Sequence, residues 1–300
     1  MAEKIETEDK FDWKKRKRRR ELIRKSLIHT VLVAGSLFFI FPFFWLLVGS
    51  FKSEVQLSLF PPTLIPIPIR WENFPEMFVQ APFLTFLKNS VIISVLNILG
   101  AVLSCSLIAY PFARLRWPGR DVVFVAVLAT MMIPFQITAV PLFLIFRKMG
   151  WIDTLYPLWV RAWFGLPFFI FLLRQFYMSI PYELEDAAKI DGCSYFGIYW
   201  RIMLPLVKPA LAVIAIFRFM FSWNDFFHPL IFIQSIEKMP LALGLQTLLP
   251  RPGQIATSPG AISFNYMLAA ALLMTFPLVI LFFFAQKYFI QGITLTGIKG

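Results

Sequence analysis

The sequence predicts an all-α, polytopic membrane protein with six transmembrane helices. Composition is the first observation: 58% of the 300 residues are hydrophobic and only 15% are charged, values far from those of a soluble domain. The second observation is that charge-free apolar runs are long enough to cross a bilayer, which takes about 20 residues. These runs cover 26–51, 89–113, 122–146 and 261–286.

Two further spans complete the six, although each contains basic residues. The run 154–173 contains Arg161, and the run 204–224 contains Lys208 near its start and Arg218 farther on. A long basic side chain in a span either reaches the membrane interface with its stem or faces a cavity or a neighbouring helix. The interface is expected for Arg161, whereas both alternatives stay open for Arg218.

Basic residues predict that both termini are cytoplasmic. Seven consecutive Lys and Arg residues occupy 14–20, just before the first span, and explain most of the net charge of +12. Loops rich in Lys and Arg stay inside, and the later basic residues Arg114, Arg174 and Lys287 then also fall inside. A basic run can neutralise nucleic-acid phosphates. Beside a span its expected role is anchoring to anionic lipid, so membrane lipid and not nucleic acid is the expected partner.

The chain divides into three parts. Residues 1–25 are a basic cytoplasmic tail, 26–84 hold the first span and an outward loop, and 85–300 form the remaining core. The outward loop at 52–82 is rich in proline and is expected to be extended rather than helical. The outward segment 226–260 contains two apolar runs too short to span, which are expected to be interfacial or re-entrant.

A polar, helix-prone stretch at 181–209 interrupts the apolar runs on the cytoplasmic side. A helix of roughly 11 residues is predicted at 181–191. Pro181 suits its first turn, and the acidic residues that follow lie near the positive end of the helix dipole. Glu185 and Lys189 have the i,i+4 spacing of a stabilising ion pair.

A turn and a second short helix are predicted after this helix. Gly192 is placed to adopt the left-handed conformation that ends a helix. Ser194 is placed to cap a second helix that runs into Leu204-Pro205. Alanines at 187 and 188 permit close approach of another backbone.

The pattern E-D-A-A-x-x-D-G, followed later by L-P, resembles the cytoplasmic EAA loop of permease subunits in ATP-binding-cassette importers. In that family the loop receives the mechanical stroke of the ATPase, so the resemblance implies a coupling site within 179–209. The residues carried over are Glu185, Asp186, Ala187, Ala188, Asp191, Gly192, Leu204 and Pro205. The sequence departs from the family at Asp186, where the usual residue is Glu.

Further stretches, in order over about two thirds of the chain, are similar to permeases of carbohydrate importers of the maltose type. They are N-S-V-I-I-S at 89–94, A-Y-P-F-A-R-L-R-W-P-G-R at 109–120, M-I-P-F-Q-I-T-A-V-P-L at 132–142, F-L-L-R-Q-F at 171–176, S-W-N-D-F-F-H-P-L at 222–230 and G-I-T-L-T-G-I-K-G at 292–300.

The resemblance implies a non-catalytic pathway subunit in the inner or plasma membrane of a prokaryote, moving a sugar or oligosaccharide. It would pair with a second, homologous permease, bind two ATPase subunits on the cytoplasmic side, and receive sugar from an extracytoplasmic binding protein. ATP and Mg would be bound by the ATPase, and no cofactor is expected in this chain. The sequence contains no G-x-x-x-x-G-K-[ST] loop that would cradle phosphates.

Alternative functions stay open at this point. An ABC permease for a non-sugar solute would carry the same loop. A secondary transporter and an intramembrane enzyme are disfavoured, because acidic residues are nearly absent from the spans. Arg218 and Asn224 are candidates for the translocation pathway. No metal site is expected, because the two Cys and two His residues are widely separated.

Overall fold

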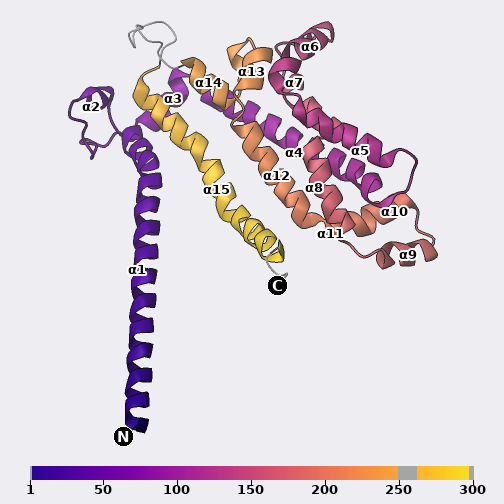
Figure 1. Cartoon of the computed structure of the whole chain (residues 1–300). Helices are drawn as coiled ribbons and strands as arrows, with labels where there is room; N and C mark the ends of the chain where they lie inside the picture. Colours follow the sequence, from indigo (N-terminus) through magenta and orange to yellow (C-terminus); the bar gives the residue numbers. More distant parts are fainter. Residues whose placement is uncertain (1, 249–261, 297–300) are drawn as a thin grey trace.

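The computed structural model describes residues 2–248 and 262–296, and the regular elements of this part are all helices, without a strand. The first helix, α1 (Ala2–Ser50), extends far beyond the body of the molecule (Figure 1). It begins within the segment expected to be a basic tail and continues without a break past residue 26, so the tail and the first span belong to one helix.

The centre of the molecule is α4 (Phe83–Arg114), which packs against α12 (Lys208–Trp223), α8 (Pro167–Met178) and η2 (Val160–Phe164). Gly100 permits the close approach of η2, because a Cβ at this position would lie 2.4 Å from the Trp163 ring. The Trp163 indole N–H donates to the Leu96 carbonyl on α4 at 3.1 Å. Buried side chains form two apolar clusters, one toward each end of α4.

Within the described residues, four helical stretches are long and apolar enough to cross a membrane, and up to six exist if each of two bent helix pairs counts as one span. The four stretches are Arg19–Ser50, Phe83–Arg114, Tyr156–Met178 and Phe264–Gln286. The stretch Tyr156–Met178 consists of α7 (Tyr156–Trp159), η2 and α8, and the last stretch belongs to α15 (Phe264–Thr296).

The apolar run at 122–146, expected to form one span, is divided between two helices at a sharp break. The helices α5 (Arg120–Ala129) and η1 (Thr130–Met132) are followed by α6 (Phe135–Lys148), which is bent away by 97°. Pro134 lies at the break, where its ring lacks an N–H and forces the preceding residue out of the helical region. The second bent pair, Tyr195–Leu206 with Lys208–Trp223, turns by 75°.

The outward loop is partly helical, which corrects the expectation of an extended segment at 52–82. It contains α2 (Glu54–Ser58) and α3 (Asn73–Gln80) on either side of the proline-rich stretch. Ser53 starts α2 with a capping box, in which its hydroxyl accepts from the Gln56 N–H and the Gln56 side chain accepts from the Ser53 N–H. The four prolines at 61–68 lie between these two helices, in a stretch that is not helical.

The short apolar runs expected after residue 226 form short helices. They are α13 (Phe227–Phe232), η4 (Ile236–Lys238) and α14 (Leu241–Leu248). The rest of that segment, and the G-I-T-L-T-G-I-K-G motif beyond residue 296, lie outside the described residues.

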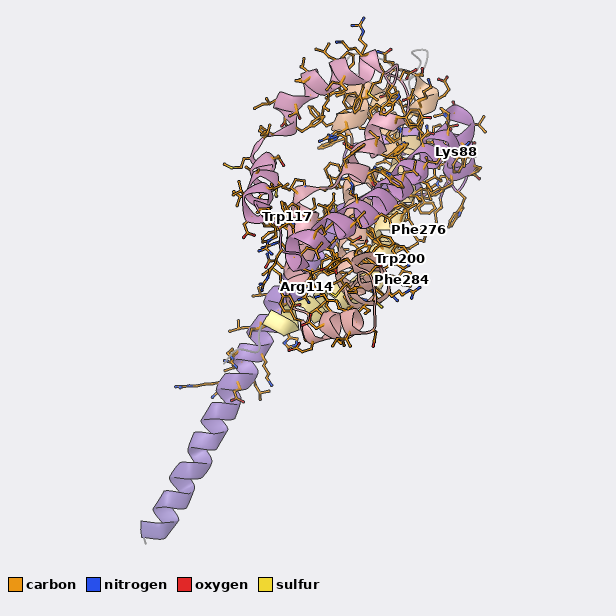
Figure 2. The ribbon with its side chains drawn as sticks, turned by 90° about the vertical axis from the view of Figure 1, so that its right-hand side faces the viewer. Lys88, Arg114, Trp117, Trp200, Phe276 and Phe284 are labelled. Atoms are coloured by element: carbon orange, nitrogen blue, oxygen red, sulfur yellow. The ribbon has the colours of Figure 1, made fainter. Side chains whose placement is uncertain are left out.

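Elements gather at two opposite ends of the body (Figure 1). At one end lie α2, α3, α13 and α14. Toward the other end lie the far end of α15 and the short helices α9 (Glu183–Ile190), α10 (Tyr195–Ile198) and α11 (Leu204–Leu206), and α1 projects beyond this end. Lys88, in the second turn of α4, and Arg114, its last residue, are labelled in Figure 2.

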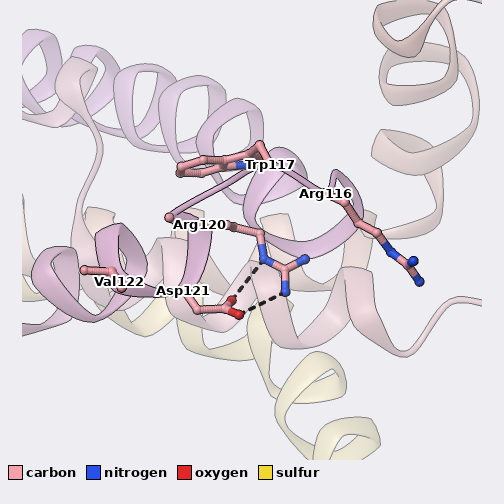
Figure 3. A pocket seen from close by; sticks show the side chains of 6 residues that line it. Arg116, Trp117, Arg120, Asp121 and Val122 are labelled. Carbon is pink, nitrogen blue, oxygen red and sulfur yellow. Dashed lines mark hydrogen bonds and ion pairs between the residues drawn. The ribbon is translucent and has the colours of Figure 1, made fainter.

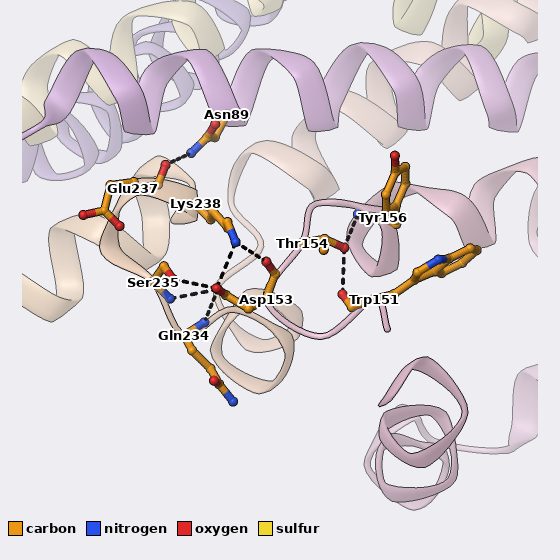
Figure 4. Close-up of polar contacts among 9 residues, drawn as sticks. All are labelled: Asn89, Trp151, Asp153, Thr154, Tyr156, Gln234, Ser235, Glu237 and Lys238. Carbon is orange, nitrogen blue, oxygen red and sulfur yellow. Dashed lines mark hydrogen bonds and ion pairs between the residues drawn. The ribbon is translucent and has the colours of Figure 1, made fainter. Parts of the chain in front are cut away.

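Asp153 ties two loops together at the first of these ends (Figure 4). One carboxylate oxygen accepts from the N–H groups of Gln234 and Ser235 at 2.9 and 2.8 Å. The other accepts from the Ser235 hydroxyl at 2.5 Å and from Lys238 Nζ at 3.0 Å. Burial raises the pKa of the Asp153 carboxyl, but these hydrogen bonds outweigh burial and hold the pKa well below its usual range.

Candidate functional site

The polar stretch folds into a helix, a turn and a second helix. The first helix, α9, covers Glu183–Ile190 and is shorter than the expected 181–191. Gly192 follows with φ of 79°. Its N–H donates to the Lys189 carbonyl at 3.0 Å and the Cys193 N–H donates to the Ala188 carbonyl at 2.9 Å. This pair of bonds is a Schellman motif, which confirms the expected role of Gly192.

Ser194 caps the second helix, as expected from its position. Its hydroxyl accepts from the Gly197 N–H at 3.2 Å. Beyond α10, a π-helical turn η3 (Tyr199–Met203) leads into α11, where Leu204 is half-buried and Pro205 is exposed. The chain then bends into α12, so the polar stretch is joined directly to a helix of the core.

Arg114, the last residue of α4, anchors the base of this stretch. Its Nε lies 3.0 Å from Glu185 Oε1, and both side chains are almost fully buried, at 0% and 2% exposure. The angle at this contact does not complete a hydrogen bond, and Oε1 has no hydrogen-bond donor. The guanidinium also donates to the Ile180 carbonyl and lies 4.3 Å above the Tyr182 ring. Arg114 therefore connects the end of α4 to the residues just before α9 and to the first turn of α9.

Glu185 points into the protein, so the expected Glu185–Lys189 pair does not form. Burial raises the pKa of the Glu185 carboxyl above its usual value, and the nearby Arg114 and Lys189 offset this only in part. Lys189 instead binds Asp186 at 3.0 Å, an exposed i,i+3 pair. The carboxylate at the position where the family has Glu is therefore on the surface.

The two alanines lie on different faces of α9. Ala188 is buried within this chain at 4% exposure, whereas Ala187 is exposed. Asp191, at the end of α9, is also exposed. Of the two, Ala187 is the residue that remains accessible to another protein.

Large apolar side chains are exposed along the polar stretch. We call this set the apolar face; its members are Leu184, Ile190, Tyr195, Phe196 and Trp200. Ile190 has 86% of its surface exposed, and the rings of Phe196 and Trp200 stack with centroids 6.4 Å apart. Several large exposed apolar side chains on one short polar segment are typical of a protein–protein interface.

Two cavities lie beside this stretch. The first, of about 430 Å³, separates α9 from the end of α4; its lining includes Arg114, Tyr182, Glu185, Asp186 and Lys189. The second, of about 420 Å³, is lined by Trp117, Arg120, Asp121 and neighbouring residues (Figure 3). Arg116 lines both cavities, and Arg120 binds Asp121 through Nε at 3.0 Å.

The pathway candidates lie elsewhere in the molecule. Arg218 turns inward and donates from Nε to the Asn97 side-chain oxygen on α4 at 3.2 Å, which answers the question left open for it. Arg161 is exposed and lies over the Phe135 ring. Asn224 follows α12 directly, is exposed and donates to the Met220 carbonyl at 2.8 Å.

Sequence reasoning missed Arg114 and Asn97 as contact residues. Arg114 counted only as one of several basic residues that set the orientation, and Asn97 lay within an apolar run without further signal. The one indication for Arg114 was its place at the cytoplasmic end of a span, on the same side as the acidic residues of the polar stretch at 181–209.

Comparison with known proteins identifies the chain's relatives. The arabinooligosaccharide transport permease AraQ of Halalkalibacterium halodurans is 37% identical over 264 residues, covering 87% of this chain and 91% of the relative. AraQ of Bacillus subtilis is 33% identical, covering 88% and 92%. The permease UgpE of the sn-glycerol-3-phosphate system of Yersinia enterocolitica is 28% identical, covering 88% and 94%.

A solved bacterial ABC transporter, involved in importing the acidic polysaccharide alginate, has the same fold, with a TM-score of 0.80 at 23% identity over 90% of this chain and 98% of that one. The family description "binding-protein-dependent transport system inner membrane component" matches residues 101–295. The chain belongs to this family of multi-pass inner membrane transport components.

Proposed function

We propose that the chain is one of two pathway subunits of an ATP-driven importer that moves a sugar or oligosaccharide across the membrane. Membership in the importer family favours this function over a secondary transporter and over an intramembrane enzyme. The names of relatives in arabinooligosaccharide transport support a carbohydrate as cargo. The subunit itself is not catalytic.

In this proposal the bent helix pairs each count as one span, which gives six spans with both termini in the cytoplasm. The arrangement in Figure 1 supports it, because α9 to α11 and the far end of α15 lie toward the end from which α1 projects. Basic residues at 14–20 then lie on the cytoplasmic side, as the distribution of Lys and Arg favours.

The coupling site is the stretch from α9 to α11, and the apolar face carries this assignment. The helix–turn–helix is fixed by the Schellman turn and anchored by Arg114, yet the side chains of its apolar face remain 45–86% exposed. An ATPase subunit that bound them would gain about 1.5–3 kcal/mol for each aliphatic or aromatic side chain fully buried. Motion of that subunit would reach α4 through Arg114 and α12 through α11.

The remaining components follow from this assignment. A second, homologous permease completes the pathway, two ATPase subunits bind ATP and Mg, and an extracytoplasmic protein delivers the sugar at the opposite end. A solved structure of a similar fold is a bacterial alginate ABC transporter in complex with an alginate pentasaccharide-bound periplasmic protein. Its TM-score is 0.62 at 20% identity, and the match covers 88% of this chain and 94% of that one. No cofactor is assigned to this chain.

Uptake of a panel of labelled oligosaccharides into proteoliposomes tests the proposal. We expect ATP-dependent uptake with the two permeases, the ATPase and the binding protein together, and none when any component is left out. Uptake by this chain alone without ATP would contradict the proposal.

A further inference from the structure

A second cluster of polar and aromatic side chains lies far from the coupling stretch. We call it the arginine–aromatic arc, formed by Arg161, Phe135, His228, Phe221 and Arg218. The Arg161 guanidinium lies 5.2 Å from the Phe135 ring, which lies 4.0 Å from the His228 ring. At the other side, Phe221 lies 5.8 Å from His228, and the Arg218 guanidinium lies 4.7 Å from Phe221. The rings of Phe135, His228 and Phe221 thus form a continuous series of contacts between the two guanidinium groups.

Four separate elements supply the arc. Arg161 comes from η2, Arg218 and Phe221 from α12, and His228 from α13. Phe135 is the first residue of α6, directly after the 97° break in that helix pair. The break therefore places an aromatic ring between elements that a straight span at this position would have kept apart.

Neither arginine has a carboxylate within ion-pair distance among the residues whose side chains the structure describes. Arg218 donates to a neutral acceptor, the side-chain oxygen of Asn97. The orientation of Asn97 is fixed, because its amide nitrogen donates to the Ile93 and Leu158 carbonyls, both at 3.0 Å. The Arg161 guanidinium lies over the Phe135 ring and forms no hydrogen bond or ion pair with the described side chains.

The nearest carboxylate, Asp225, is already engaged. Its Oδ1 lies 2.9 Å from His228 Nδ1 and accepts from the His228 backbone N–H at 3.2 Å. Asp225 attracts both guanidinium groups, while Arg161 and Arg218 repel one another. With two arginines and one aspartate the cluster carries a surplus of one positive charge even when His228 is neutral.

We propose that the arginine–aromatic arc binds an anionic group, a carboxylate, on the transported carbohydrate, so that the cargo is an acidic oligosaccharide. This inference rests on the proposed function. Charged side chains within membrane-spanning segments are costly unless they meet a partner or line a path. Guanidinium groups match carboxylates through paired hydrogen bonds, and aromatic rings offer the flat apolar contact that a sugar ring needs.

Each arm of the arc has a distinct task in this proposal. Arg218, half-buried and aimed by Asn97, fixes the position of the anion, whereas the exposed Arg161 meets it at the surface. His228 lies against the Phe135 and Phe221 rings, is positioned by Asp225, and with Asp225 offers polar groups to sugar hydroxyls. A neutral oligosaccharide would leave both cations without a partner and would bind more weakly.

The test compares uptake of two probes by the complete transporter in proteoliposomes. The probes are a labelled trisaccharide of galacturonic acid and the matched trisaccharide of galactose, each also offered within a panel of other acidic and neutral oligosaccharides. We expect ATP-dependent uptake of acidic members and at least about tenfold less uptake of their neutral counterparts, as for loss of a hydrogen bond to a charged group.

Variants assign the effect to the arc. Arg218→Gln and Arg161→Gln should each lower uptake of the accepted acidic member about tenfold or more, with Arg218→Lys intermediate, because lysine keeps the charge but not the paired donors. Arg147→Gln is the matched control, because Arg147 is exposed at the end of α6 and its side chain forms no hydrogen bond or ion pair in the described part; uptake should be unchanged.

Three outcomes would overturn the inference. ATP-dependent uptake restricted to neutral members would leave the importer function intact and refute acidic cargo. Loss of co-purification with the second permease in the Arg161→Gln and Arg218→Gln variants, with unchanged preference for acidic members, would assign the arginines to a carboxylate of that subunit. Absence of ATP-dependent uptake for every carbohydrate would refute the proposed function, and the inference with it.

Discussion

The two ends of the molecule stabilise a buried or half-buried carboxylate by different means. Asp153 accepts four hydrogen bonds from three residues of one neighbouring segment, and its pKa is lowered. Glu185 faces one guanidinium, its Oε1 has no hydrogen-bond donor, and its pKa is raised by burial. The hydrogen bonds of Asp153 hold its carboxylate in one position. Glu185 has fewer interactions, so its contact with Arg114 is less fixed.

This difference suits the functions proposed for the two ends. An end that receives a binding protein benefits from loops held in one arrangement. The end that binds an ATPase must pass movement into the core, and a single arginine that connects α4 to α9 is a contact through which movement can pass. Because of this difference, the two ends should respond differently to substitution and to pH.

The largest effect is expected at Arg114. Arg114→Met removes the ion pair with Glu185, the hydrogen bond to the Ile180 carbonyl and the contact with the Tyr182 ring, and leaves a buried carboxyl without a partner. We expect a loss of about 3–5 kcal/mol in stability, measured by thermal unfolding of the purified complex. The double variant Arg114→Met with Glu185→Leu should recover part of this loss. A double variant less stable than Arg114→Met would contradict a net cost of burying the carboxyl.

At the opposite end Asp153→Asn should cost about 1.5–3 kcal/mol, because hydrogen bonds to a charged acceptor are replaced by bonds to a neutral one. The lowered pKa gives the sign of the pH dependence: the unfolded chain binds the proton more tightly, so wild-type stability rises with pH. The cost of the substitution should be complete above about pH 4 and shrink as the pH falls below it. A cost that is constant from pH 3 to 8 would contradict the role of the charge.

Glu185→Gln should show the opposite pH dependence. The folded protein binds this proton more tightly than the unfolded chain, because the pKa is raised. Wild-type stability relative to the variant should therefore be highest near pH 4 and decline as the pH rises through the raised pKa. Unfolding midpoints of both proteins across pH 4–8 measure this. A wild-type advantage that grows with pH would show that Arg114 dominates over burial.

Gly192→Val should have a smaller effect on folding and a clear one on coupling. The position has φ of 79° and no atom near the site of an added Cβ, so the cost is backbone strain alone, about 1–2 kcal/mol. Transport per ATP hydrolysed should fall, because the Schellman turn sets the angle between α9 and α10. Lys189→Gln is the control, since its ion pair is exposed, and it should behave as wild type in both measurements.

The sequence predicted those parts of the site that depend on interactions between residues close together in the chain. Gly192 and Ser194 were predicted as turn and cap because each acts on a backbone only a few residues away. The direction of Glu185 was not predictable, since it depends on Arg114, which is distant in the sequence. Pro134 by itself indicates a break in a helix, but the 97° bend and the contact of α6 with α13 involve residues distant in the sequence.

The membrane character followed from composition and run length, whereas the arginine–aromatic arc did not. Its members come from four elements, and no spacing in the sequence relates Phe135 to Arg161 or to His228. Arg218 was identifiable as a charge within an apolar run, but only the fold shows that its partner is an amide of Asn97.

The central claim is that the apolar face binds the ATPase, and co-purification of the ATPase with two glutamate variants tests it most directly. Ile190→Glu places a charge at the most exposed member of the face, and Ile65→Glu places the same charge at an exposed isoleucine of the outward loop, 68% exposed. We predict that Ile190→Glu lowers ATPase binding about tenfold or more, from the lost burial of one isoleucine, and that Ile65→Glu leaves it unchanged. Wild-type binding by Ile190→Glu, or equal losses in both variants, would contradict the claim.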